Sequence, residues 1–168
     1  YPDPENHPGS CNGQGPYDLG YVIDPQHIQI RWIGGINTWA SEDGGESWDL
    51  MNFWTPEIPG IPAVHADKHW FAFHPLQPET FMEANDGGIY YTKDYGATWT
   101  DISHGLQIGQ IYRIGSSWSE TDLVVAGFQD NGSQVDSSGF WRAPEAIGGD
   151  GMDCMIDYVD PQVKYASY

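Results

Sequence analysis

Basic residues are scarce in this sequence. The 168 residues include only 6 Lys and Arg against 24 Asp and Glu, which gives a formal net charge of −18. Binding to nucleic acid depends on Lys and Arg side chains that displace counterions from the phosphates. Docking on an anionic membrane surface depends on the same side chains. The composition therefore argues against both partners. It leaves neutral or cationic partners open, sugars among them, and acidity also keeps a secreted protein soluble.

Long apolar runs and cysteines are also rare. No run approaches the roughly 20 apolar residues of a membrane span, and no Lys/Arg-headed apolar signal segment stands at the start. Because the chain opens with Tyr1-Pro-Asp-Pro, we expect it to be a piece of a longer protein. Cys11 lies in a Gly/Pro-rich lead and Cys154 in an apolar segment, which favours two separate cysteines. A disulfide between them in an oxidising compartment stays the alternative.

Aromatic residues, glycine and proline are abundant instead: 8 Trp, 10 Tyr, 6 Phe, 21 Gly and 12 Pro. This composition is typical of short strands separated by many turns. One pattern, Ser/Thr-x-Asp-x-Gly-x-Ser/Thr-Trp, occurs twice, 51 residues apart. Its Asp can accept hydrogen bonds from turn N–H groups, and its Gly permits a positive φ. The residues assigned to these two structural turns are Ser41, Asp43, Gly45, Trp48, Thr92, Asp94, Gly96 and Trp99.

A repeated hairpin at this period predicts a repeat array of blades. Four candidate inner strands end at residues spaced 50, 43 and 40 apart: Asp24, His74, Ser117 and Asp157. We therefore predict an all-β chain, a β-propeller fragment of about three and a half four-stranded blades. The predicted segments are an irregular lead at 1–16 and blades at about 17–54, 65–102, 110–142 and, incomplete, 150–168. We expect the open blades to contact the rest of the parent polypeptide or another copy of the chain.

The start of each inner strand is the predicted functional surface, because these strands line the central channel of a propeller. The residues expected at this channel mouth are Tyr17, His65, Asp67, His69, Gln110 and Asp150. Strand alternation would place His65, Asp67 and His69 on one face. Such a set could bind a transition metal, perform acid–base chemistry, contact substrate or form a hydrogen-bonded structural cluster. No metal is assigned.

Glycine-rich turns contain further carboxylates. Asp86, Asp130 and Asp150 lie in such turns and are expected to crowd one rim. Crowded carboxylates can bind a cation such as calcium, or they can shift one another's pKa and provide an acid–base pair. Tight backbone turning accounts for the same glycines without any ligand. The candidate catalytic carboxylates are therefore Asp67, Asp86, Asp130 and Asp150, and no cofactor other than calcium is suggested.

The repeated turns look like the Asp-box (BNR) hairpins of sialidase-like and sortilin-like propellers. Together with the segments 64–75, 85–99, 105–114 and 129–132, they make the chain resemble the large secreted propeller proteins of Bacteroidetes-type bacteria. Many of those proteins carry a type IX secretion signal. The resemblance implies a secreted or cell-surface protein. Because such propellers are similar to xyloglucanase-type enzymes, it also suggests a glycoside hydrolase, although the catalytic aspartates of that family match no positions here.

Two functions follow as hypotheses. The first is a non-catalytic propeller module for adhesion, assembly or carbohydrate binding. The second is a glycoside hydrolase with a carboxylate pair at the channel. Carboxyl separations of about 5–5.5 Å or 6.5–9.5 Å beside an open cleft would favour the second.

Overall fold

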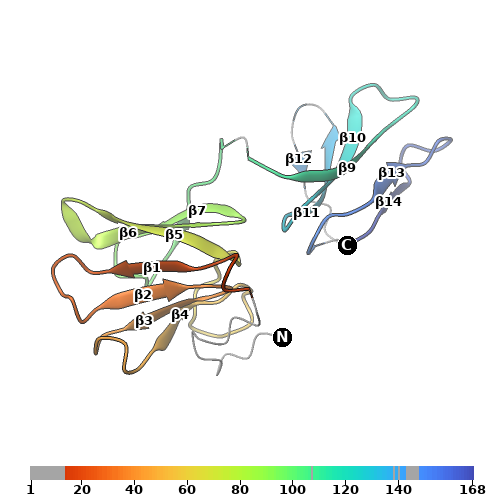
Figure 1. The fold of residues 1–168 in the computed structure, drawn as a ribbon. Helices are drawn as coiled ribbons and strands as arrows, with labels where there is room; N and C mark the ends of the chain where they lie inside the picture. Colours follow the sequence, from red (N-terminus) through yellow and green to blue (C-terminus); the bar gives the residue numbers. More distant parts are fainter. Residues whose placement is uncertain (1–13, 107, 138, 140, 143–147) are drawn as a thin grey trace. The chain divides into compact units, whose positions relative to one another are not determined.

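In the computed structural model, the described residues are 14–106, 108–137, 139, 141–142 and 148–168 (Figure 1). They form fourteen β-strands, and none of them is helical. This part of the chain accordingly contains no helix long and apolar enough to cross a membrane. The prediction of an all-β fold is confirmed. The chain divides into two compact units, Tyr1–Leu106 and Gln107–Tyr168, and each is described by itself.

The first unit consists of two antiparallel sheets of four strands, and in both sheets the strands neighbour one another in chain order. The first sheet contains β1 (Gly20–Ile23), β2 (Arg31–Gly34), β3 (Thr38–Ser41) and β4 (Asp49–Asn52). The second contains β5 (Lys68–His74), β6 (Gln77–Asn85), β7 (Gly88–Thr92) and β8 (Thr100–Asp101). Such a four-stranded meander is the structure of a propeller blade.

The second unit repeats the same meander. Its four-stranded sheet contains β9 (Ile111–Ser116), β10 (Leu123–Phe128), β11 (Gly132–Ser137) and β12 (Trp141–Arg142). A two-stranded sheet follows, made of β13 (Cys154–Ile156) and β14 (Lys164–Ala166). Cys154 is buried, and burial raises the pKa of its thiol. Its predicted relation to Cys11 stays a prediction, because Cys11 and residues 1–13 of the predicted lead lie outside the described residues.

Successive sheets pack face to face within each unit. In the first unit the rings of Trp32 and Phe81 lie 5.0 Å apart across the two sheets, and Phe71 joins the same core. Glycine permits the close approach: a Cβ on Gly34 of β2 would lie 2.5 Å from the Cβ of Lys68 on β5. In the second unit a Cβ on Gly127 would lie 2.1 Å from the carbonyl oxygen of Met152. Face-to-face packing of successive meanders confirms the propeller fold class.

The two repeated turns have matching hydrogen bonds. The Gly45 N–H donates to Ser41 Oγ (2.8 Å) and the Gly96 N–H to Thr92 Oγ1 (2.8 Å). Each aspartate accepts a hydrogen bond from the backbone N–H four residues later: Asp43 from Ser47 (2.9 Å) and Asp94 from Thr98 (2.8 Å). Each box Trp donates its indole N–H to the turn glycine's carbonyl. These bonds satisfy turn groups that water or a strand partner would otherwise have to pair.

The four predicted inner-strand ends are structurally equivalent. Each side chain accepts a hydrogen bond from a backbone N–H two or three residues later and so closes the turn into the second strand. The pairs are Asp24 with Gln26 (2.6 Å), His74 with Leu76 (3.1 Å), Ser117 with Glu120 (3.1 Å) and Asp157 with Val159 (2.8 Å). Their spacing in the sequence therefore corresponds to one recurring turn.

Candidate functional site

A short turn before β1 positions the first two residues of the site. The backbone N–H groups of Tyr17 and Asp18 both donate to the carbonyl oxygen of Gln14, at 2.6 and 3.1 Å. The Tyr17 side chain is half-exposed, whereas Asp18 is completely buried. The sequence predicted a strand from Tyr17 onward, but β1 begins only at Gly20 because this turn uses the preceding backbone groups.

The loop before β5 positions Asp67. This residue has a φ of 61°, a left-handed conformation that is uncommon outside glycine but tolerated by Asp. Strand geometry begins at Lys68, whose N–H donates to the Gly35 carbonyl at 2.8 Å. The expectation that alternation places His65, Asp67 and His69 on one strand face is therefore wrong. His65 instead packs against Gly87, where a Cβ would lie 2.4 Å from its Cγ.

Tyr17, His69 and Asp86 form one hydrogen-bonded group. His69 Nε2 lies 2.6 Å from Asp86 Oδ1, and the Tyr17 hydroxyl donates to Asp86 Oδ2 at 2.9 Å. The Tyr17 ring stands edge-on to the His69 ring, with centroids 5.1 Å apart. Both oxygens of Asp86 thus have protein partners. Asp86 lies in the turn after β6. This turn is closed by a hydrogen bond from the Gly87 N–H to Asn85 Oδ1, one residue on either side of Asp86.

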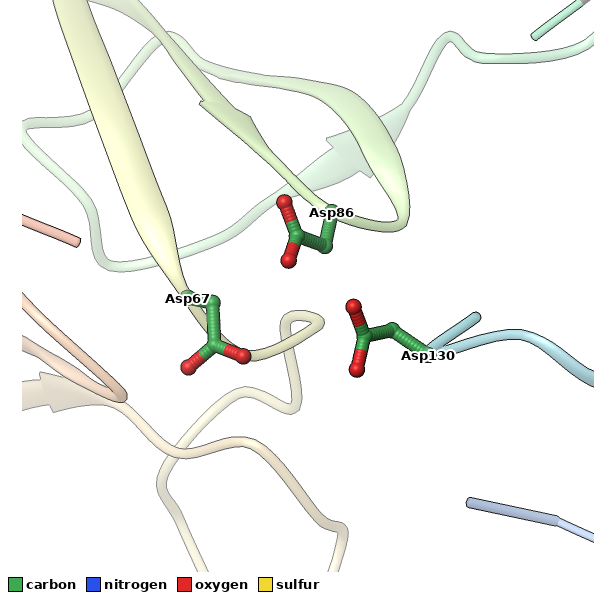
Figure 2. Close-up of side chains that lie close together, drawn as sticks. All are labelled: Asp67, Asp86 and Asp130. Carbon is green, nitrogen blue, oxygen red and sulfur yellow. The ribbon is translucent and has the colours of Figure 1, made fainter. Parts of the chain in front are cut away.

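Asp67 lies next to this group. Figure 2 shows the two carboxylates: that of Asp67 extends from the loop before β5, and that of Asp86 extends from the turn after β6. The two residues offer carboxylate oxygens within 4.8 Å of one another. Two oxygens at that separation can contact the same small cation, because Ca²⁺–oxygen distances are about 2.3–2.6 Å.

Asp18 is the most unusual carboxylate of the first unit. Its carboxylate interacts with Asp67 and His69, and no other described residue donates a hydrogen bond to either of its oxygens. Burial and the neighbouring Asp67 carboxylate together raise the pKa of Asp18 to about 6, against a smaller lowering effect of His69. Asp18 was not among the residues predicted from the sequence. The available signal was one charged residue, second in the otherwise uncharged segment 17–23.

A buried ion pair lies next to the site, since its lysine directly follows Asp67 in the chain. Lys68 Nζ lies 3.0 Å from Glu83 Oε1, and both side chains are completely buried. Lys68 also donates to the carbonyl oxygens of Val64 and His65. Glu83 accepts further bonds from Thr38 Oγ1 (2.7 Å), Asn52 Nδ2 (2.9 Å) and Asn85 Nδ2 (3.2 Å). Because Thr38 and Asn52 belong to the first sheet, this network joins the two sheets, and it was not predicted.

The remaining predicted site residues belong to the second unit. The Asp130 N–H donates to Asp150 Oδ1 at 3.0 Å, and Asp130 has a φ of 58°. The carbonyl oxygen of Gln110 accepts from the Gln129 N–H at 2.8 Å. These contacts bring Asp130 and Asp150 together. The expected rim of Asp86 with Asp130 and Asp150 stays a prediction.

The fold and the site together define a propeller chain with a cluster of carboxylates before β1, before β5 and after β6. No family model matches the chain. A probable oligoxyloglucan-reducing end-specific xyloglucanase of Neosartorya fischeri is 25% identical over 114 residues, which are 66% of this chain and 13% of that protein. The chain thus spans only a small part of this curated relative.

Two solved structures are also similar to the chain. The GH74 xyloglucanase of Xanthomonas campestris matches with a TM-score of 0.42 and 15% identity, over 87% of this chain and 26% of that one. YCF48 of Cyanidioschyzon merolae matches with a TM-score of 0.39 and 14% identity, over 75% of this chain and 36% of that one.

Proposed function

We propose that this chain is a saccharide-binding propeller module of a secreted or cell-surface protein, and that Tyr17, His69 and Asp86 form its binding site. Saccharide sites combine an apolar ring surface with a few fixed polar groups that set orientation. The hydrogen-bonded group of a half-exposed tyrosine, an imidazole and a carboxylate supplies both, and this is the observation that carries the proposal. The similarity to a xyloglucanase supports a plant-type glucan as the first ligand to test.

The acidity of the chain fits the same proposal. Neutral saccharides are not repelled by a chain of net charge −18, whereas polyanions are. The extracellular location is part of the proposal and rests on the resemblance of the repeated turns to the Asp-box hairpins of secreted propellers, many of which carry a type IX secretion signal.

The test is calorimetric titration of the 168-residue chain with xyloglucan oligosaccharides. We expect Tyr17→Ala and His69→Ala to weaken binding by about tenfold or more, which corresponds to about 1.4 kcal/mol. Tyr165→Ala is a matched control, because Tyr165 is equally exposed and its hydroxyl also lies near a carboxylate, 3.5 Å from Asp157 Oδ2. Equal losses in Tyr17→Ala and Tyr165→Ala, or no binding of any neutral glucan by the wild type, would contradict the proposal.

A second candidate function is glycoside hydrolysis. It is favoured by the xyloglucanase relative and by the proximity of Asp67 and Asp86, whose oxygens approach within 4.8 Å. Such proximity is compatible with the retaining class of hydrolases, in which the two carboxyl groups are about 5–5.5 Å apart, and not with the separation of about 6.5–9.5 Å in inverting enzymes. Release of reducing ends from xyloglucan, abolished in Asp67→Asn and Asp86→Asn, would establish hydrolysis. Binding without any release of reducing ends would establish the binding module.

A further inference from the structure

We propose that Asp67 and Asp86 bind a divalent cation of the calcium type in the first unit, with the buried Asp18 carboxylate next to Asp67. The two ligand residues lie in the loop before β5 and in the turn after β6 (Figure 2). Their carboxylate oxygens lie within 4.8 Å of one another, close enough for both to contact one cation at calcium–oxygen distances of about 2.3–2.6 Å. Water molecules would complete the six to eight ligands that calcium takes.

Asp18 is the independent observation that points to an ion. Its side chain is completely buried, and neither of its oxygens accepts a hydrogen bond from any described residue. A buried polar group without partners is costly, and proteins normally pair it. Asp18 and Asp67 interact directly, so a cation bound at Asp67 would also compensate the charge of Asp18. His69 and Lys68 act on Asp18 electrostatically, but neither donates a hydrogen bond to it.

The charges around the cluster leave it strongly negative. Asp18, Asp67 and Asp86 contribute three carboxylates, and the nearest cationic side chains are Lys68 and His69. The Lys68 ammonium is paired with Glu83 and the carbonyl oxygens of Val64 and His65, and it also interacts electrostatically with Asp18 and Asp67. His69 contributes at most one positive charge, through its contact with Asp86 Oδ1. A divalent ion would neutralise the remaining negative charge of these carboxylates.

The ligand chemistry selects the class of ion. Carboxylate and water oxygens are the ligands of hard cations such as Ca²⁺ and Mg²⁺, whereas zinc prefers imidazole and thiolate. The imidazole of this cluster, His69, is bonded to Asp86. The two carboxylates come from separate loops, which suits the flexible coordination of calcium better than the strict octahedron of magnesium.

The experiment measures cation binding to the chelator-treated 168-residue chain without saccharide, by titration calorimetry and by thermal unfolding at fixed ionic strength. We expect saturable binding of one Ca²⁺ and an unfolding temperature that rises with its concentration, because a ligand of the folded state stabilises it by mass action. Asp67→Asn and Asp86→Asn should weaken binding by about tenfold or more. Asn tolerates the left-handed backbone of position 67, so the first variant should fold.

The controls separate a site from general screening of a chain of net charge −18. Asp49→Asn removes an exposed carboxylate from β4, away from the cluster, and should leave binding unchanged. Asp18→Asn should also weaken binding while stabilising the cation-free protein, since it removes an unpaired buried charge. Equal effects of Asp49→Asn and Asp67→Asn, binding of zinc but not calcium, or no saturable binding would each overturn the proposal. These results do not depend on whether the chain binds saccharide.

Discussion

The buried ion pair between Lys68 and Glu83 allows a quantitative prediction. Replacing Glu83 by Gln leaves the ammonium of Lys68 inside the protein with two backbone carbonyl oxygens as partners. Replacing Lys68 by Met leaves the Glu83 carboxylate with three donors, Thr38, Asn52 and Asn85. We therefore expect Glu83→Gln to be the more destabilising single substitution, and the double variant to be more stable than the sum of the two effects predicts.

The magnitude follows from the burial of both groups. Removing one partner of a buried ion pair typically costs about 3–5 kcal/mol, whereas replacing the pair as a whole is often nearly neutral. A single domain is stable by only about 5–15 kcal/mol. Glu83→Gln should thus remove a large fraction of the stability of the first unit, and Lys68→Met/Glu83→Gln should recover about 2 kcal/mol or more of it.

The pH dependence gives this prediction its sharpest form. Burial lowers the pKa of Lys68, and the charge of Glu83 opposes that effect. A lysine whose pKa is lower in the folded than in the unfolded state destabilises the fold when charged, and stability rises as pH increases through the folded-state pKa. Without Glu83 the pKa of Lys68 falls further. The cost of Glu83→Gln should therefore shrink as pH rises, relative to the double variant.

Denaturant unfolding of the wild type, both single variants and the double variant at pH 6 and pH 9 measures all of these differences. The reasoning is refuted if Glu83→Gln is as stable as the double variant at pH 6. It is equally refuted if the difference between them does not decrease at pH 9.

Three further predictions can be checked by the same unfolding measurements. Gly34→Ala should destabilise by about 1–3 kcal/mol through overpacking, because the new methyl would meet Lys68 and Phe71, whereas Gly148→Ala, with nothing within 4 Å, should be neutral. Asp24→Asn should cost stability at pH 7, and this cost should shrink as the pH falls below 3.8. Burial alone would raise the pKa of Asp24, but hydrogen bonds from Gln26 and His27 outweigh burial and lower the pKa; the stabilisation is therefore present above the unfolded value of 3.8 and is lost as pH falls through the lower folded-state pKa. Asp94→Ala should cost about 1 kcal/mol from lost turn hydrogen bonds and leave saccharide binding unchanged; full stability with lost binding would contradict the structural role of that turn.

The fold was predictable because its signals are local and repeated. The Asp, Gly and Trp of the repeated turn each satisfy a requirement of one tight hairpin, and two copies at one spacing imply a repeat. The residues that end the inner strands could be aligned for the same reason, since Asp24 and Asp157 close the same kind of turn. Such information is contained within four or five residues and needs no knowledge of what packs above or below.

The candidate site was only partly predictable, because its contacts join residues far apart in the sequence. Tyr17, Asp67 and His69 were predicted at one channel mouth and Asp86 on a rim of carboxylates. The pairing of Tyr17 with Asp86, which spans 69 residues, was not predicted. Alternation misplaced His65 because the positive φ of Asp67 interrupts the extended backbone. The close approach of Gly34 to Lys68 fixes where β5 begins relative to β2, and nothing in either segment alone indicates it.

A comparison of three buried carboxylates in the first unit shows why Asp18 indicates a ligand. Glu83 is completely buried and has an ammonium, two amides and a hydroxyl as partners. Asp24 is equally buried and accepts two backbone N–H bonds and one contact from an imidazole. These two residues follow the general rule that buried charges are paired. Asp18 has the same burial, and no described residue donates a hydrogen bond to it. Since the chain satisfies its other two buried carboxylates so completely, the third is best explained by a partner that is not a side chain. We infer that this partner is the cation bound at Asp67.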